Sequence, residues 1–398
     1  MRLKIGVLIV FSLFTGLLCG CREVPDKVKE NMKEYGDNEC NEEVAISYCT
    51  VDELKSINNS TFLLTGSSNI EYPDYFDFSR VEEIGTVEFK YREDYCDEAT
   101  RFTTFFEVDE SVRKNFIGNV TGFQGILFDD INKENYLYVG DNGDVSFVGS
   151  DFYNDASVPG TTKTEKLYFM RGDKKTKEVN LNGAVVDLKE LVSFGEKCCE
   201  DLIELKEISP LARTAFIRRD SAGNDTVSLN LELLYKGVVL DCFGSRMCFD
   251  SDNVGFMDSI GNNINIVINK MGSLAVFTIN GVLEAGSFVK EEKLVDFQSA
   301  VKILEKELST FNKIKVVEIE PVYVLHPIYD YKAGEYYAAA GNKVIARPVY
   351  SFLIEYGDDD DGIYINEDNG LVYVNVDMVT GELTTNFENR GFRTGEGE

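Results

Sequence analysis

Four Asn-Gly pairs, each set between two apolar runs, constrain the fold of this 398-residue chain more than any other feature. A two-residue hairpin turn of type I′ needs positive φ at both central residues, and Asn-Gly adopts this conformation at low cost. The pairs are Asn142-Gly143, Asn182-Gly183, Asn280-Gly281 and Asn369-Gly370. Their flanking runs (136–139 with 145–148, 179–181 with 184–188, 274–279 with 282–283, and 364–365 with 371–376) predict four β-hairpins. Antiparallel sheet should therefore dominate.

Two long segments, 187–208 and 293–308, carry apolar residues at helical spacing. The first stripe includes Leu188, Leu191, Cys198, Cys199 and Leu202, and the second includes Phe297, Ala300, Val301, Leu304 and Leu308. Shorter helices are expected at 51–57 and after Asp109. A helix laid across one face of a sheet buries the apolar sides of both. The chain is therefore predicted to have an α+β fold that is rich in antiparallel sheet.

The order of these segments predicts consecutive units along the chain. Residues 45–185 are expected to form a mostly β N-terminal module. Residues 186–292 and 293–385 are each expected to form a helix followed by antiparallel sheet. The tail at 386–398 is rich in glycine and should fray, since nothing in its sequence ties it to a core.

The first 21 residues predict where the protein is located. Arg2 and Lys4 precede an apolar run at 5–18, which is too short to span a bilayer comfortably and suits a signal peptide. The run ends in Leu18-Cys19-Gly20-Cys21, which resembles the lipobox of bacterial lipoproteins. The resemblance implies that 1–20 is a signal peptide, that Cys21 receives the lipid, and that the protein is anchored at the extracytoplasmic face of the cell membrane. Two acyl chains on one residue suffice for stable anchoring.

The next segment and the overall charge refine this picture. Residues 21–44 are polar without apolar periodicity and read as a tether, about 25 Å long as a coil. The chain has 40 Lys and Arg against 69 Asp and Glu, giving a net charge of −29. Such an acidic chain lacks the basic surface that a nucleic-acid partner requires.

Cysteine usage favours neither metal nor redox chemistry. Of nine cysteines, seven remain unacylated after processing, an odd number that leaves at least one outside any bridge. Cys242 and Cys248 flank a Gly-Ser turn, and we expect a local disulfide between them. Cys198 and Cys199 lie on a helical stripe, which favours buried structural thiols. The acidic turn 358–361 fails as a calcium loop because position twelve would be Asp368 and not Glu. We therefore predict no metal site and no cofactor.

Catalytic motifs are absent from the sequence, and no catalytic residue is predicted. The single histidine, His326, follows an apolar strand and precedes Pro327 without a neighbouring motif, so we expect it to be structural. A pair of carboxylates, as in glycosidases, leaves no local signature and stays open.

Three segments of the last unit carry the residues of a known type of module. They read IKVVEIEPVYVLHP, VIARPVYSFLIEY and GLVYVNVDMVTGEL, and the matching positions are Tyr323, Pro348, Tyr350, Asn375, Thr380, Gly381 and Glu382. This pattern resembles the PepSY-like and YycI-like modules of Gram-positive extracytoplasmic proteins. The chain departs from the pattern in having Tyr350 where a Trp is common. The whole chain is also similar to uncharacterised lipoproteins of clostridial type, which implies a protein partner at the cell envelope.

These observations favour a membrane-anchored lipoprotein that acts as a non-enzymatic interaction or regulatory module. One alternative is a ligand-binding lipoprotein with an aromatic and acidic cleft, for which Tyr336, Tyr337, Tyr350 and the turn 358–361 are candidates. A second alternative is a hydrolase that works through carboxylates. On the wet face of the last sheet, Asn375 and Asp377 are expected to point outward.

Overall fold

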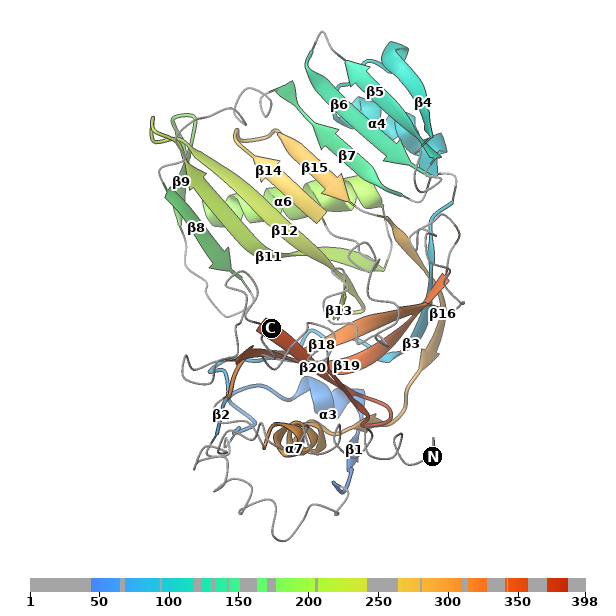
Figure 1. The fold of residues 1–398 in the computed structure, drawn as a ribbon, viewed down its shortest axis with the longest axis vertical. Coiled ribbons are helices and arrows are strands. Elements are labelled where there is room, and N and C mark those ends of the chain that lie inside the picture. Colours follow the sequence, from blue (N-terminus) through green and yellow to red (C-terminus); the bar gives the residue numbers. More distant parts are fainter. Residues whose placement is uncertain are drawn as a thin grey trace, which may run out of the picture.

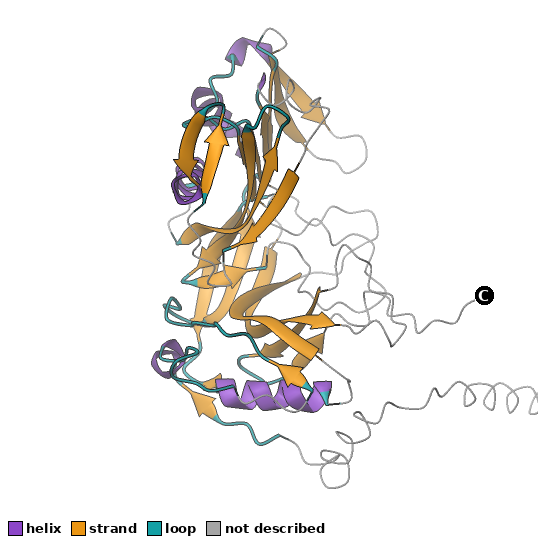
Figure 2. Cartoon of the chain, turned by 90° about the vertical axis from the view of Figure 1, so that its left-hand side faces the viewer, coloured by secondary structure: helices purple, strands orange, loops and turns teal. Residues whose placement is uncertain are grey.

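The computed structural model describes residues 44–64, 69–93, 95–117, 124–130, 133–141, 143–150, 163–169, 177–204, 207–241, 264–279, 281–309, 314–327, 341, 343–356 and 371–385. They form two lobes, one above the other, each built on a twisted sheet that is largely antiparallel (Figure 1). The helices of the upper lobe lie on one side of its sheet (Figure 2). The predicted α+β class, rich in antiparallel sheet, is confirmed.

The upper sheet contains nine antiparallel strands. In spatial order they are β8 (Lys163–Tyr168), β11 (Ile208–Arg219), β12 (Asp225–Tyr235), β14 (Ile264–Ile268), β15 (Val276–Ile279), β7 (Val145–Val148), β6 (Asn135–Gly140), β5 (Gln124–Asp130) and β4 (Arg113–Ile117). Helices α6 (Leu188–Ile203) and α4 (Ala99–Phe105) cover one face. A separate hairpin of β9 (Glu178–Leu181) and β10 (Ala184–Asp187) leads into α6.

The lower sheet is organised around two long strands, β18 (Ile314–Pro327) and β19 (Lys343–Tyr356). The other edge of β19 pairs with β3 (Gly85–Tyr91) at one end and with β20 (Leu371–Asp377) at the other. Beyond these lie β16 (Leu283–Lys290) and β21 (Leu383–Thr385). Two short strands, β2 (Ile70–Glu71) and β13 (Val238–Leu240), run parallel to β18.

Helix α7 (Phe297–Leu308) lies against the lower sheet at the end of the molecule away from the upper lobe (Figure 1). Phe297 is fully buried, with ring contacts to Phe78, Tyr350 and Phe352. Close by lie α3 (Val51–Lys55) and the pair of β1 (Tyr48–Cys49) with β17 (Leu294–Val295).

The predicted helices are confirmed, with shorter bounds that follow from their caps. The carboxylates of Asp187 and Asp296 accept backbone N–H bonds at the starts of α6 and α7, which satisfies donors that the helix itself cannot. Thr50 and Glu53 form a capping box at the start of α3. The short helix expected after Asp109 is a 3₁₀ helix, Glu110–Val112.

Two of the predicted hairpins are confirmed and one is wrong. Strands β6 and β7 pair across Gly143, and β9 and β10 pair across Asn182-Gly183, both of which have positive φ. The hairpin predicted around Gly281 does not form. Because β14 and β7 already flank β15 on both sides, no edge of β15 is free, and the chain passes to the lower sheet as β16. The Asn369-Gly370 turn lies outside the described residues.

Strand pairing crosses both of the predicted module boundaries. Strand β7 from the first predicted unit pairs with β15 from the second, and β3 from the first pairs with β16 and β19 from the second and third. Each sheet therefore contains strands from distant parts of the chain, and one continuous apolar cluster runs through both lobes.

The two lobes meet at a buried ion cluster around Arg213 of β11. Its guanidinium contacts Glu232 of β12 at 2.8 Å, Glu318 of β18 at 3.0 Å and Glu320 of β18 at 2.5 Å. The side chains of these four residues are between 6% and 15% exposed. Arg80 adds a contact to Glu320 at 3.3 Å. The cluster thus joins two strands of the upper sheet to the central strand of the lower one.

A tight turn beside the cluster also joins the lobes. Lys236 and Gly237, both with positive φ, reverse the chain from β12 to β13, and β13 then pairs with β18. A Cβ on Gly237 would lie 1.9 Å from the carbonyl oxygen of Arg80, so glycine is required for this close approach.

We expect Arg213→Ala to lower the free energy of unfolding by about 3–5 kcal/mol, because three buried carboxylates would lose their common cation. Urea unfolding followed by circular dichroism measures this. Lys114→Ala is the matched control, since Lys114 and Asp129 form an exposed pair at 3.8 Å, and its loss should cost less than about 1 kcal/mol. A cost for Arg213→Ala no larger than for Lys114→Ala would contradict this role.

Candidate functional site

Three of the residues singled out in the last unit are buried. Tyr350 is fully buried, and its hydroxyl donates a hydrogen bond to the carbonyl of Val295 at 2.8 Å, so it lines no cleft. Tyr323 is also fully buried. Asn375 was expected to point outward and is instead 0% exposed, as are Val374 and Val376 on either side of it, so both faces of β20 are covered there. Tyr336, Tyr337 and 358–361 lie outside the described residues.

Some of the predicted cysteine sites lie within the described residues and others do not. Cys21 with the signal peptide, and the expected pair Cys242 and Cys248, lie outside the described residues. Cys198 and Cys199 are buried on α6, as the helical stripe predicted. None of the helices in the described part of the chain has the length and hydropathy needed to cross a bilayer.

His326 lies in β18 opposite Ile345 of β19. Burial and the positive charge of Arg347 lower the pKa of its imidazole, with the carboxylate of Asp377 acting in the opposite direction. The side chain is therefore neutral at physiological pH. The two charged groups that act on it, Arg347 of β19 and Asp377 of β20, belong to the same sheet.

Three carboxylates gather at the lobe junction. Glu232, Glu318 and Glu320 all contact the guanidinium of Arg213, so their charges are already paired with a cation. Within the described ranges, no group of three or more His, Cys, Asp or Glu side chains is arranged to hold a metal ion.

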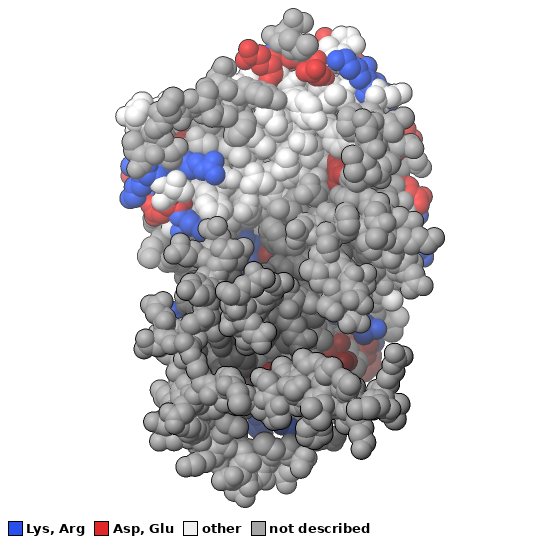
Figure 3. Space-filling view, in the orientation of Figure 1, with Lys and Arg blue, Asp and Glu red and all other residues white. Residues whose placement is uncertain are grey.

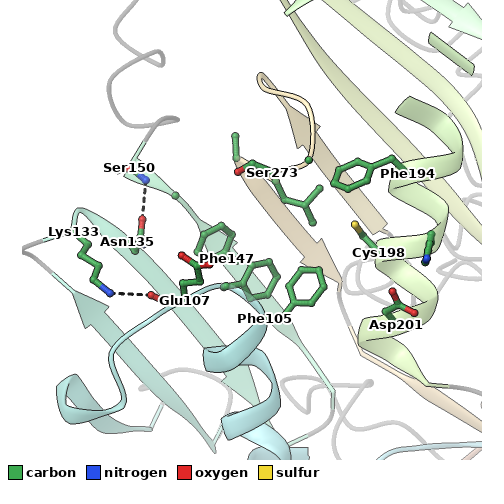
Figure 4. A pocket seen from close by; sticks show the side chains of 16 residues that line it. Phe105, Glu107, Lys133, Asn135, Phe147, Ser150, Phe194, Cys198, Asp201 and Ser273 are labelled. Carbon is green, nitrogen blue, oxygen red and sulfur yellow. Dashed lines mark hydrogen bonds between the residues drawn. The ribbon is translucent and has the colours of Figure 1, made fainter. Parts of the chain in front are cut away.

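A cavity of about 730 Å³ lies on the helix side of the upper sheet. We call it the α4–α6 groove. The residues that line it come from the end of α4, from β6 and β7, from α6, and from the turn between β14 and β15 (Figure 4). Its volume falls in the range typical of sites for small organic ligands.

Phenylalanines form the floor of the groove. The rings of Phe106 and Phe147 stack at 4.1 Å with an interplanar angle of 12°. Phe105 contacts Phe106 edge-on and is itself 39% exposed, an unusual position for a large apolar ring. Phe194 of α6 lies on the opposite side (Figure 4). Together they offer an apolar surface that is open to a ligand.

Charges of both signs surround this floor. Glu107 and Lys133 lie on the α4 side, and Asp201 and Lys197 on the α6 side. Lys133 Nζ donates a hydrogen bond to the carbonyl oxygen of Glu107 at 3.1 Å, which fixes the end of α4 against the β5–β6 turn. The side chains of Glu107, Lys197 and Asp201 are exposed. The rim can therefore meet both a cation and an anion.

Cys198 is the thiol that faces the groove. Burial, and secondarily the nearby carboxylate of Asp201, raises its pKa to about 11. A nucleophilic cysteine requires the opposite shift, because the thiolate is the reactive form. The thiol is therefore protonated at neutral pH and contributes apolar surface to the groove.

The sequence offered one weak signal for this site. The doublet Phe105-Phe106 follows a short amphipathic segment. Phe147, Phe194 and Leu274 each lie in an ordinary apolar run, so the sequence does not mark them as parts of a site. Only the pairing of β15 with β7 brings the segments around 105, 147 and 274 together.

Comparison with known proteins shows that this chain is similar in fold to a solved structure. No family model matches the chain, and no curated protein matches it. Among solved structures, it is similar to an uncharacterized protein from Eubacterium rectale ATCC 33656, with a TM-score of 0.52 and 15% sequence identity. The match covers 84% of this chain and 96% of that chain. At this identity the likeness shows the fold alone. It assigns no enzymatic activity, and the resemblance to PepSY-like modules stays a prediction.

Proposed function

We propose that this protein is a non-catalytic binding protein, held at the outer face of the cell membrane by lipid on Cys21, whose α4–α6 groove takes a short peptide segment. The observation that carries this proposal is the open phenylalanine floor with charges of both signs around it. The proposal combines the interaction module that the sequence favours with its first alternative, a ligand-binding protein.

Binding is favoured over catalysis by the chemistry of the groove. Acyl or glycosyl transfer needs a nucleophile, a base and a group that orients them within reach of one another. The thiol of Cys198 is protonated, and Glu107 and Asp201 lie on opposite sides of Phe105 (Figure 4). The gathered glutamates at Arg213 are already occupied by its guanidinium.

A peptide fits the groove better than other small ligands. Its apolar side chains can cover Phe105 and Phe106, while its ammonium and carboxylate groups can approach the acids and lysines of the rim. A purely anionic ligand is disfavoured by the net charge of −29. A lipid chain would gain nothing from four charged groups at the rim.

The position of the groove suits a membrane-anchored receptor. The described chain enters the fold in the lower lobe, where β1 lies beside α7, whereas α4 lies at the far end of the upper lobe (Figure 1). A lipid on Cys21 would be joined to the lower lobe through 21–44. The groove would then be held away from the membrane surface.

We predict that Cys21→Ala prevents lipid attachment and processing, so that the mature, lipid-anchored form is lost. Cells that express the wild type should retain it in the membrane fraction, and globomycin-type inhibition of lipoprotein processing should cause the precursor to accumulate. In the Cys21→Ala variant the lipid cannot be attached. A mature-length Cys21→Ala product that still sediments with membranes and resists washing with salt would disprove lipid anchoring.

We also predict that Phe105→Ala weakens peptide binding by about tenfold or more, since it removes an exposed part of the floor, and tenfold corresponds to 1.4 kcal/mol. Isothermal titration of residues 22–398 with a set of tripeptides to pentapeptides that carry one Phe or Leu, one Lys and one Glu measures this. A bound peptide should also slow alkylation of Cys198 at pH 9.

Tyr75→Ala is the matched control, because Tyr75 is 46% exposed and lies in the connection between β2 and β3 of the lower lobe. It should leave the affinity unchanged. If none of the peptides binds, or if both variants bind as the wild type does, the groove is not a peptide site. The Cys21→Ala experiment tests lipid anchoring independently of this result.

A further inference from the structure

The face of the upper sheet opposite α4 and α6 carries an uncharged patch. We call this side the outer face. On the five adjacent strands β12, β14, β15, β7 and β6, the patch consists of Ser228, Asn230, Asn265, Val267, Val276, Thr278, Ser146, Val148, Tyr136 and Tyr138. None of these ten is charged, although charged residues make up 27% of the chain. Carboxylates border the patch: Glu232 follows Asn230 on the same side of β12 and pairs with Arg213, and Asp144 adds to the effect of burial in raising the pKa of Tyr138. Figure 3 shows this surface as a white area with charged atoms at its margins.

The alternation of the strands separates this patch from the core. On each of the five strands, the residue between the outward ones is buried in the apolar cluster. These inward residues are Leu229, Ile266, Phe277, Phe147 and Leu137, with exposures of 4% or less. The ten outward residues, except Val267 and Val276, remain partly accessible. The patch is therefore a surface of the sheet and not part of the packing beneath α6.

Strand register aligns the polar residues into a row. Asn230 lies opposite Asn265, Asn265 opposite Thr278, Thr278 opposite Ser146, and Ser146 opposite Tyr138. At a strand spacing of about 4.8 Å, the row is roughly 19 Å long. Every member carries an amide or a hydroxyl group, each of which can both donate and accept hydrogen bonds.

Hydrogen bonds within the row hold its side chains in place. Asn265 Nδ2 donates to Asn230 Oδ1 at 2.7 Å and to Ser228 Oγ at 3.0 Å. The amides are thus oriented before any ligand arrives, which lowers the entropy lost on binding.

The end of the row is the ring of Tyr138. A Cβ on Gly125, in the neighbouring strand β5, would lie 2.6 Å from Cε2 of Tyr138. The ring therefore occupies the space that any other residue at 125 would fill, and the side chain stays partly accessible.

We propose that the outer face of the upper sheet binds a neutral glycan chain. A row of groups that both donate and accept matches the hydroxyls of sugars, and the partly accessible ring of Tyr138 can cover C–H groups of a sugar. The row itself offers no charge to an ionic polymer, and the net charge of −29 repels an anionic one. The valines beside the row, Val148, Val267 and Val276, form only a small apolar cluster, whereas a protein partner is expected to meet a larger hydrophobic centre.

This site is separate from the α4–α6 groove and does not depend on it. Phe147 of β7 points into the groove, whereas Ser146 belongs to the outer face, so the two sites lie on opposite sides of one sheet. Phe105→Ala should therefore leave glycan binding unchanged.

Affinity electrophoresis of residues 22–398 in gels that contain amylose, mixed-linkage β-glucan, xylan or galactomannan tests the proposal, with polygalacturonate as the anionic comparison. At least one neutral polymer should retard the protein, and polygalacturonate should not. Ser146→Glu places a charge in the row and should weaken the apparent affinity at least tenfold. Tyr138→Ala removes the ring at the end of the row and should weaken it similarly.

Thr104→Glu is the matched control, since it adds the same charge at an exposed position of α4 on the other side of the sheet. It should behave as the wild type. Circular dichroism of each variant distinguishes lost binding from lost folding, and Ser146→Glu carries the test if Tyr138→Ala unfolds. Retardation by no neutral polymer, equal retardation of Ser146→Glu and wild type, or stronger retardation by polygalacturonate would each overturn the proposal.

Discussion

The contact between Arg213 and three glutamates determines how the two lobes are held together. Arg213 and Glu232 belong to the upper sheet, and Glu318 and Glu320 belong to the lower one, so two of the three contacts of Arg213 cross between the lobes. Buried ions cost several kcal/mol each unless they are paired, and separating the lobes would break the contacts of Arg213 with Glu318 and Glu320 and leave only Arg80 beside Glu320. The Lys236-Gly237 turn and the pairing of β13 with β18 reinforce the same junction. We therefore regard the two lobes as one rigid body.

Rigidity at the junction bears on how the protein can work. Many binding proteins close two lobes around a ligand by a hinge, but here the residues that line the groove all come from the upper lobe. Both proposed sites are built on the same sheet. Side chains alternate along β7, so that Phe147 lies on the groove side of the sheet and Ser146 on the outer face. Binding would then depend on preformed surfaces held at a fixed distance from the anchor.

The sequence predicted local structure well and long-range structure poorly. Helix stripes, such as Leu188, Leu191 and Leu202 of α6, are encoded within a few residues and predicted both long helices. Asn-Gly turns were equally local, but the pair at Gly281 failed because β15 was already flanked by strands from elsewhere in the chain. The groove, the ion cluster and the polar row all arise from such distant pairings. Single residues in them, such as Phe147 or Asn265, carry no signal on their own.

Native-state hydrogen exchange tests the central claim, that both lobes form one rigid body, most directly. Exchange is followed by mass spectrometry at several low urea concentrations. Amides of β13 and of β18 near Glu318 and Glu320 should open only with the free energy of the sheet cores, β12 and β19. If the junction amides exchange much faster than both cores, the lobes move independently and the account is wrong.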